Sequence, residues 1–485
     1  MNNNSQQGSQ GTGADIVGAI IEALTELVKI VFELLWTLLK RLLNKRPPLE
    51  RIDPKLLSSR KKSTRPESLG RSLNSRRDLL FKKIDFDKHT FIVGAAGFGK
   101  TNLLSLLQEH DLQEDRPIIF FDPKGDLEAL TTFKEICERY KRECLIFSEH
   151  YPGSIKLNPL KQGSVGQIVE QIMGSFDWDN SFYKDLAYST LSEIILELKM
   201  KAEIVSFKNI LAVLNKCDEK NLEKILGLKV KLTKIVTSDF APLLDDDGKA
   251  WTFDLIRQKR ACLYIGLSTQ GYGETAMALG KVFLSELLFH SYQTLLKAED
   301  SHASMAQAIS VYFDEVGSLI TPRFIELQNK CRGAGIRLSF ACQSVADIDR
   351  VSPELTKQVI ENAANLFIFK QRVESSTKFL AESIGTVPVM KQTFQTESDQ
   401  KSGRGSLREA NELIVHPDMI KNLRVGQCVL VRHNPSRVDL LNLRERSRPQ
   451  ISKPMVPKIE TTSKEIQECS NSLSLIPDAS KSSTL

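Results

Sequence analysis

The sequence lacks the residue patterns of a metal site or of a disulfide-bonded secreted domain. None of its eight cysteines forms a C-x-x-C pair, and its seven histidines show no metal-ligand spacing. Cys262 and Cys342 lie in apolar, strand-like runs, so we expect buried, reduced thiols in a cytosolic domain. Internal repeats are also absent. What is left is an ordinary globular composition, with 41% hydrophobic and 26% charged residues.

A cleavable signal peptide is not expected either, because the first 14 residues are polar. An apolar pattern of helical period starts later, over Ile16–Leu43. A helix of that length extends about 42 Å, which exceeds a bilayer core of about 30 Å. One side of this helix carries a polar stripe, made of Glu22, Glu26, Lys29, Glu33, Thr37 and Lys40.

Three arrangements of this segment stay open. It could lie in the membrane interface, span the membrane in a bundle with its polar stripe inward, or pack as a coiled-coil or core helix of a soluble protein. Membrane association is favoured by a basic cluster that follows at once, made of Lys40, Arg41, Lys45 and Arg46. The positive-inside bias then predicts that the rest of the chain lies in the cytoplasm.

The most specific motif is a phosphate-binding loop. The run Gly94-Ala95-Ala96-Gly97-Phe98-Gly99-Lys100-Thr101 follows an apolar stretch and fits G-x-x-x-x-G-K-[ST]. Its glycines keep the loop open, so that backbone N–H groups can converge on a triphosphate. Lys100 is expected to reach the β- and γ-phosphates, and the Thr101 hydroxyl to ligate Mg²⁺. The helix expected next would direct its N-terminal dipole at the anion.

A second part of the nucleotide site follows a downstream strand. The apolar run Ala308–Phe313 ends at Asp314 and Glu315. Strands of a parallel sheet are buried on both faces, and ligands bind at their carboxyl ends. Asp314 is therefore predicted to hold the Mg²⁺ shell and Glu315 to polarise the attacking water. The predicted cofactors are ATP and Mg²⁺.

The remaining pattern predicts an α/β fold. Eight apolar runs are typical of strands, and helical stretches separate most of them, as in a doubly wound parallel sheet. The predicted strands are His89–Val93, Pro117–Phe121, Cys144–Phe147, Ala261–Leu267, Ile309–Phe313, Arg337–Ala341, Asn365–Phe369 and Cys428–Arg432.

One interval breaks this alternation, because residues 164–254 show helical period and no clear strand. We predict an all-α domain inserted into the sheet domain. For its aromatic cluster, helix-core packing is favoured over stacking on nucleic-acid bases; the cluster is Phe176, Trp178, Phe182, Tyr183 and Tyr188. Thr386–Gly405 is predicted to be a mobile loop. The other predicted parts are an N-terminal segment with the membrane-associated helix (1–46), a basic linker (47–80), a nucleotide-binding domain (81–163 and 255–446) and a disordered tail (447–485).

Several motifs follow one another in an order typical of one family. They are DPKGD at Asp122–Asp126, KLNPL at Lys156–Leu160, FDEVGSL at Phe313–Leu319, NKCRGAGIRL at Asn329–Leu338 and ACQSVADI at Ala341–Ile348. From about Phe81 to Arg446, the chain resembles the TraD/TraG coupling ATPases of type IV secretion and conjugation. These are related to the DNA pumps of the FtsK/HerA group.

The resemblance implies a RecA-like P-loop motor domain with an inserted all-α domain. It also implies a hexamer at the bacterial inner membrane, which hands single-stranded DNA and its attached relaxase to a type IV secretion channel. Gln343 would sense the γ-phosphate, and Arg332 would reach the neighbouring subunit's nucleotide as an arginine finger. Lys124 and Asp126 are expected near the phosphates. The family commonly has two transmembrane helices, whereas this chain has one imperfect apolar segment.

We therefore predict an ATPase that couples hydrolysis to the transfer of conjugative DNA. Two other motors stay open: a double-strand DNA translocase of the FtsK/HerA kind, and an ATPase that moves only protein. A docking scaffold that binds nucleotide without hydrolysing it is disfavoured, because the residues needed for hydrolysis are all present.

Overall fold

The computed structural model describes residues 25, 27–29, 31–32, 35, 49–216, 225–300, 308–397, 400–433 and 436–446. The described residues between 25 and 35 are helical, in agreement with the helix predicted there. The rest of that helix and the predicted tail at 447–485 lie outside the described residues. Within the described part of the chain, no helix is long and apolar enough to cross a membrane.

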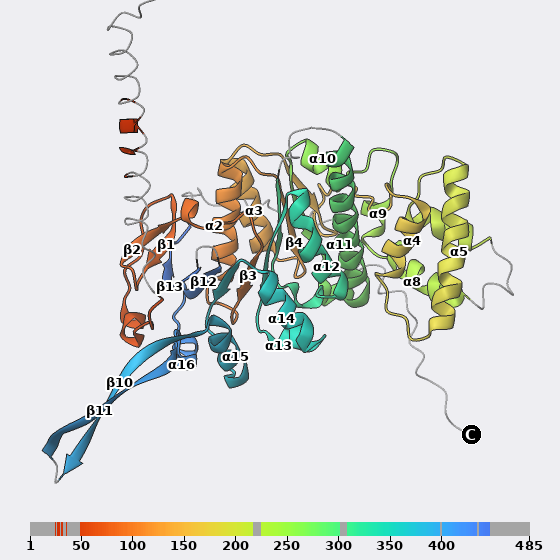
Figure 1. Cartoon of the computed structure of the whole chain (residues 1–485). Coiled ribbons are helices and arrows are strands. Elements are labelled where there is room, and N and C mark those ends of the chain that lie inside the picture. Colours follow the sequence, from red (N-terminus) through yellow and green to blue (C-terminus); the bar gives the residue numbers. More distant parts are fainter. Residues whose placement is uncertain are drawn as a thin grey trace, which may run out of the picture. The chain divides into compact units, whose positions relative to one another are not determined.

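An 11-stranded mixed sheet runs through the chain (Figure 1). Its strand order is β2-β1-β13-β12-β9-β3-β8-β7-β4-β6-β5. The seven strands from β9 to β5 are parallel, and the four at the other edge pair antiparallel. All eight predicted strands correspond to strands of this sheet. The bounds are β1 Ser68–Ser72, β2 Arg77–Leu80, β3 Thr90–Val93, β4 Ile118–Asp122, β5 Cys144–Phe147, β6 Cys262–Gly266, β7 Ile309–Phe313, β8 Ile336–Cys342, β9 Asn365–Ile368, β12 Gln427–His433 and β13 Ser436–Leu443.

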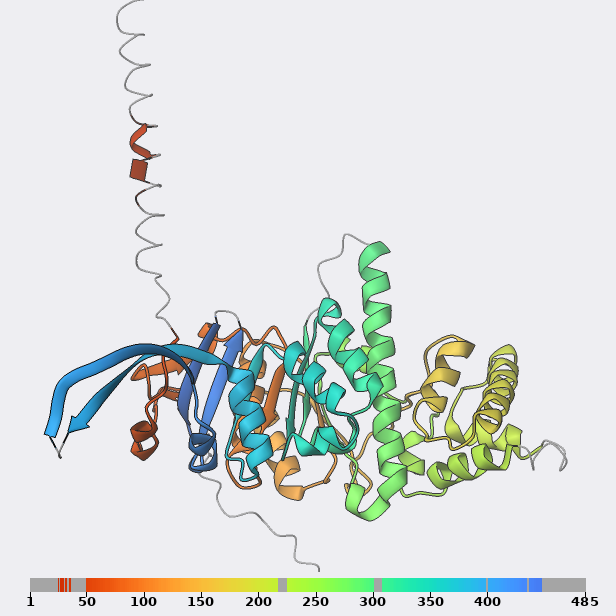
Figure 2. The ribbon, with the colours of Figure 1, turned by 60° about the horizontal axis from the view of Figure 1, so that its bottom comes forward.

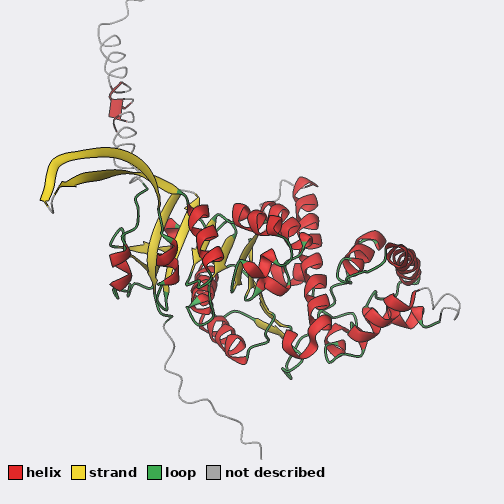
Figure 3. Cartoon of the chain, turned by 90° about the horizontal axis from the view of Figure 1, so that it is seen from below, coloured by secondary structure: helices red, strands yellow, loops and turns green. Residues whose placement is uncertain are grey.

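Helices cover both faces of the parallel strands (Figure 3). Ile92 packs on one face with residues of α2 and α3, while Phe91 and Val93 pack on the other face with residues of α11, α12 and α14. Central strands β4 and β7 are buried along their whole length, which is why they read as continuous apolar runs. The helices are α2 Lys100–Gln113, α3 Leu127–Arg139, α4 Val165–Met173, α5 Ser181–Met200, α6 Phe207–Leu214, α8 Leu226–Val236, α9 Ala241–Leu244, α10 Phe253–Gln258, α11 Thr269–Asp300, α12 Pro322–Lys330, α13 Ala346–Asp349, α14 Pro353–Asn362, α15 Glu374–Ile384 and α16 Pro417–Lys421.

The interval between β5 and β6 is helical, as predicted. Its described residues form α4, α5, α6, α8, α9 and α10 and one isolated bridge, Leu157 to Trp251. These helices share one compact unit with the sheet, so a separate inserted domain stays a prediction. Phe182, Tyr183 and Tyr188 are 65%, 51% and 36% exposed, so the predicted core packing is wrong for these three rings. Phe176 and Trp178 are partly buried and pack against the core, as predicted.

Two sequence predictions are corrected by strand pairing. The predicted linker at 47–80 contains β1 and β2; β1 pairs with β2 and β13, and Leu69 on β1 is fully buried. The predicted mobile loop at Thr386–Gly405 belongs to an antiparallel hairpin of β10 (Thr386–Glu397) and β11 (Gln400–Leu413) (Figure 2). Neither segment shows the alternating or continuous apolar pattern that predicts a strand. Each becomes a strand because its backbone pairs with other strands, β2 and β13 in the case of β1 and β11 in the case of β10.

Candidate functional site

The phosphate-binding loop joins β3 to α2. Gly99 has a φ of 109°, a conformation that favours glycine, and forms the N-cap of α2. Gly94 is closely packed, because a Cβ there would lie 2.3 Å from the Cβ of Phe369. Within the described chain no side chain caps α2, and Ala96 and Gly97 are exposed. The helix N-terminus is therefore accessible to an anion.

The sheet brings the predicted catalytic and metal-binding residues together at one edge. β8 lies between β3 and β7 and pairs in parallel with both, so the carboxyl ends of the three strands lie side by side. The segments that follow them carry Lys100, at the start of α2, the pair Asp314 and Glu315, and Gln343. These segments are far apart in sequence, and the parallel sheet alone explains their convergence.

The predicted magnesium ligands face each other. The Thr101 hydroxyl lies 3.5 Å from Oδ2 of Asp314. Asp314 is buried, and burial raises the pKa of its carboxyl, while the ammonium of Lys124 opposes that rise. No group of three or more His, Cys, Asp or Glu that could hold a metal by itself occurs among the described residues. The pair suits Mg²⁺, which keeps most of its ligands as water and phosphate oxygens.

Glu315 is held in an unusual position. Its backbone is left-handed, with φ 68° and ψ 56°, which costs a non-glycine residue about 1–2 kcal/mol. Its Oε2 accepts a hydrogen bond from Nε2 of Gln343 at 2.8 Å and lies 3.3 Å from Nζ of Lys124. Such strain persists only where surrounding contacts enforce it, and it concentrates at functional sites. The carboxylate is thus oriented before any ligand binds.

Lys100 is buried within its own loop. Its Nζ donates to the carbonyl oxygens of Gly94 at 2.6 Å and Ala95 at 3.2 Å. Burial lowers the pKa of the ammonium, and the nearby carboxylates Glu315 and Asp314 oppose that shift. The side chain therefore lies between the phosphate-binding loop and the acidic pair, where a phosphate would need a cation.

Sequence reasoning missed the roles of two polar residues at this edge. Lys124 was expected near the phosphates without a defined role, and the structure places it against Glu315. Gln371, only 3% exposed, donates from Nε2 to the backbone carbonyl of Gln343 at 2.7 Å. The sequence did carry a signal for both residues, because each follows an apolar strand by two or three positions. Lys124 comes shortly after β4, and Gln371 shortly after β9.

The two remaining predicted residues lie at opposite edges of the sheet, Arg332 before β8 and Asp126 after β4 at the carboxyl edge. Arg332 is exposed in the 3-10 helix η5, Cys331–Ala334, which precedes β8 and so lies at the opposite edge of the sheet. It cannot serve the nucleotide site of its own chain without a large rearrangement. Asp126 caps α3, where its carboxylate accepts from the backbone N–H of Glu128 at 2.9 Å.

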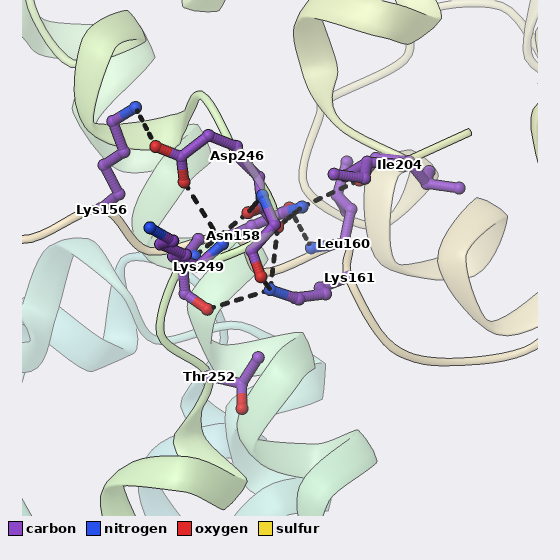
Figure 4. Close-up of polar contacts among 12 residues, drawn as sticks. Lys156, Asn158, Leu160, Lys161, Ile204, Asp246, Lys249 and Thr252 are labelled. Carbon is purple, nitrogen blue, oxygen red and sulfur yellow. Dashed lines mark hydrogen bonds and ion pairs between the residues drawn. The ribbon is translucent and has the colours of Figure 1, made fainter. Parts of the chain in front are cut away.

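The KLNPL motif forms a junction at the start of the helical interval (Figure 4). Asn158 donates from Nδ2 to Asp246 at 3.1 Å and to the carbonyl of Val205 at 3.0 Å. Lys161 lies 3.3 Å from the same Asp246 carboxylate, and Asp246 accepts from the backbone N–H groups of Gly248 and Ala250. Asp246 thus ties the entry of the helical interval to its exit.

Comparisons with known protein families support the sequence prediction. Residues 308–424 match the family described as the TraM recognition site of TraD and TraG, and residues 69–239 match the central domain of the helicase HerA. The resemblance to the TraD/TraG coupling ATPases is confirmed. A curated, uncharacterized protein from Mycoplasma pneumoniae is 37% identical over 54 residues, which are 10% of this chain and 45% of that protein.

Solved structures share the fold over most of the chain. The bacterial conjugative coupling protein TrwB, without its first 70 residues, aligns with a TM-score of 0.60 at 13% identity, over 84% of this chain and 94% of that one. TrwB with the non-hydrolysable ATP analogue ADPNP aligns with a TM-score of 0.57 at 14% identity, over 84% of this chain and 98% of that one. VirB4 of Thermoanaerobacter pseudethanolicus aligns with a TM-score of 0.53 at 14% identity, over 79% of this chain and 98% of that one. The large mixed sheet is therefore the P-loop fold of the coupling proteins.

Proposed function

We propose that this chain is an ATPase. The observation that carries the proposal is the meeting of the phosphate-binding loop with Asp314 and a positioned Glu315 at one sheet edge. The loop Gly94–Thr101 would hold the triphosphate of ATP, and Thr101 and Asp314 would hold Mg²⁺. Bound Mg²⁺ would neutralise charge on the phosphate oxygens during transfer.

The chain's own residues then have separate tasks. Lys100 leaves its loop carbonyls and binds phosphate oxygen, and Glu315 accepts a proton from the attacking water. Gln343 holds the Glu315 carboxylate through its side-chain amide, and in this proposal the same amide senses the γ-phosphate. Arg332 completes the site of a neighbouring subunit, because it is exposed at the edge opposite its own loop.

We further propose that this ATPase couples hydrolysis to the transfer of conjugative DNA. The proposal includes a homo-hexamer at the bacterial inner membrane, with the motor in the cytoplasm, that passes single-stranded DNA and its relaxase to a type IV secretion channel. Support comes from the TraD/TraG match and from the TrwB-like fold. The membrane part is supported by the apolar pattern at Ile16–Leu43 and its basic flank.

A double-strand DNA translocase is the second candidate, because residues 69–239 match the HerA central domain. Hydrolysis measured with single-stranded and double-stranded DNA of equal length distinguishes the two motors. Stimulation by single strands supports coupling to conjugation, whereas a preference for duplex supports the HerA-like function. No stimulation by either DNA favours an ATPase that moves only protein.

The decisive experiment combines mating and turnover. A donor strain lacking this protein is complemented with the wild type, with Lys100→Ala, or with the control Lys134→Ala on α3. We expect the Lys100 variant to lose both DNA transfer and ATP hydrolysis, and the control to keep both. Normal transfer by a hydrolysis-dead Lys100→Ala protein would contradict the proposed function. Cell fractionation of the full chain, and of a chain lacking residues 1–46, tests the membrane location.

A further inference from the structure

The segment that carries Arg332 is short and anchored on both sides. It consists of η5, followed by Gly335 in a left-handed conformation and then by β8. Arg332 itself is exposed, while Cys331 and Ala334 on either side are buried. The position of the guanidinium therefore depends on what holds these two buried residues.

The first anchor is His89, which immediately precedes β3 and is 3% exposed. Its Nδ1 accepts the backbone N–H of Leu338 on β8 at 3.1 Å. Its Nε2 lies 4.0 Å from Sγ of Cys331, and the ring also has a hydrogen bond with the backbone of Gln328 on α12. One imidazole thus contacts the chain before and after η5. Burial lowers the pKa of His89 to about 4, so the ring is neutral at physiological pH, with its proton on Nε2.

The second anchor is Arg257 on α10, which is 6% exposed. Its Nη2 donates to the carbonyl oxygen of Ala334, the last residue of η5, at 2.7 Å. Its Nη1 donates to the Thr294 hydroxyl on α11 at 3.2 Å and lies 3.4 Å from Nε2 of His290. The end of η5 is therefore tied to two helices on one face of the sheet.

The anchors also connect the two edges of the sheet. β3 starts one residue after His89 and leads at its carboxyl end into Gly94–Thr101. At about 3.3 Å per residue, His89 lies roughly 17 Å from Gly94 along one buried strand. The strand β3 thus links the chain's own nucleotide site to His89, which contacts the segment that carries Arg332.

We propose that His89 and Arg257 are positioning residues, which hold Cys331–Ala334 so that Arg332 reaches the nucleotide of the adjacent subunit. The inference rests on the role in a neighbouring subunit proposed above for Arg332. A misplacement of about 1 Å lowers a rate by about 10²-fold, while loss of an arginine finger costs about 10³-fold or more. The anchor variants should therefore be impaired, but less than Arg332→Ala.

Mixed oligomers provide the test. His89→Ala and Arg257→Met should each lower turnover about 10²-fold and leave ATP affinity within about twofold, because their own phosphate loops are intact. Mixing either with Lys100→Ala, which still supplies a well-positioned Arg332, should restore turnover. A merely structural defect would lower ATP binding and oligomer formation together, and mixing would restore nothing.

Two controls separate this inference from the function on which it rests. Arg332→Ala mixed with Lys100→Ala must recover activity; if it does not, the role of Arg332 in a neighbouring subunit fails, and the inference fails with it. If that pair recovers and neither anchor variant does, only the inference is overturned. His110→Ala, whose ring packs on Phe81 and Phe86 instead of on η5, should keep normal turnover. If His89→Ala does not fold, His89→Asn, which keeps an acceptor for Leu338, takes its place and should show a smaller, equally rescuable loss.

Discussion

The two edges of the parallel sheet are built in opposite ways. At the carboxyl edge, charged groups face one another with partial exposure: Lys124 and Glu315 are 42% and 20% exposed at their side chains. At the amino edge, the exposed Arg332 belongs to a short segment that the buried residues His89 and Arg257 hold in place. A site that receives a ligand needs accessible charge, whereas a residue delivered to another subunit needs a rigid, buried support. The predictions below test this difference, from the largest effect to the smallest.

The largest effect is expected at the carboxyl edge. Glu315→Gln removes the proton acceptor while keeping the side-chain size, and should lower kcat by about 10²–10⁴-fold. ATP binding should persist, because the phosphate loop is unchanged; steady-state turnover and equilibrium nucleotide binding measure the two effects. Glu326→Gln, an exposed carboxylate that pairs with Lys330 on α12, is the control and should stay near wild type. Near-normal turnover of Glu315→Gln would show that Glu315 is not the proton acceptor in hydrolysis.

A large stability effect is expected from a buried carboxyl near the amino-edge anchors. Glu286 on α11 lies one turn before His290, and burial raises its pKa to about 8. The folded state then keeps a proton that the unfolded state releases above pH 4.5, so stability falls as pH rises from about 4.5 to 8. Glu286→Gln should stabilise the protein by roughly 2–4 kcal/mol at pH 8 and by little at pH 4.5. Urea unfolding at both pH values measures this, and an equal effect at both would contradict it.

A smaller kinetic effect is expected for Lys124. Its ammonium is the cation nearest to Glu315 outside the phosphate loop, and a hydrogen bond to a charged group contributes about 1.5–3 kcal/mol. Lys124→Met should therefore lower kcat about 10–100-fold. The control is Lys134→Met, whose ammonium contacts the Tyr151 hydroxyl and not the site. If both variants keep wild-type rates, Lys124 has no part in hydrolysis.

The smallest effect is expected for the stability of Arg332→Ala. An exposed side chain away from buried networks usually changes the free energy of unfolding by less than about 0.5 kcal/mol. His89→Ala should cost more, because it leaves the Leu338 N–H without its buried acceptor. Thermal unfolding of both variants compares them directly. Equal destabilisation would show that Arg332 is itself part of the support.

Sequence patterns predicted the parallel strands well and the antiparallel ones poorly. Five of the seven parallel strands are buried along their whole length, so they leave runs of apolar residues such as Ile118–Phe121. β1, in contrast, is Ser68–Ser72, with a glycine and an arginine, and it is a strand because β2 and β13 pair with it on either side. The β10–β11 hairpin is equally polar, and its register depends on the facing strand.

The site divides in the same way. The phosphate-binding loop and the Asp314–Glu315 pair were evident because each is a local motif directly after a buried strand. The roles of Lys124 and Gln371 were not evident from the sequence. Lys124 contacts Glu315 and Gln371 contacts Gln343, and these contacts form only when the ends of separate strands meet.

The P-loop, the parallel strands and the resemblance to the coupling ATPases could be predicted from the sequence, because short, contiguous patterns encode them. The cation that faces Glu315 and the support of Arg332 became clear only in the folded molecule. His89 and Leu338 are 249 residues apart, and Arg257 and Ala334 are 77 apart. No local pattern encodes such pairs, since they form only when strand order brings β3 beside β8 and packs α10 and α11 against η5.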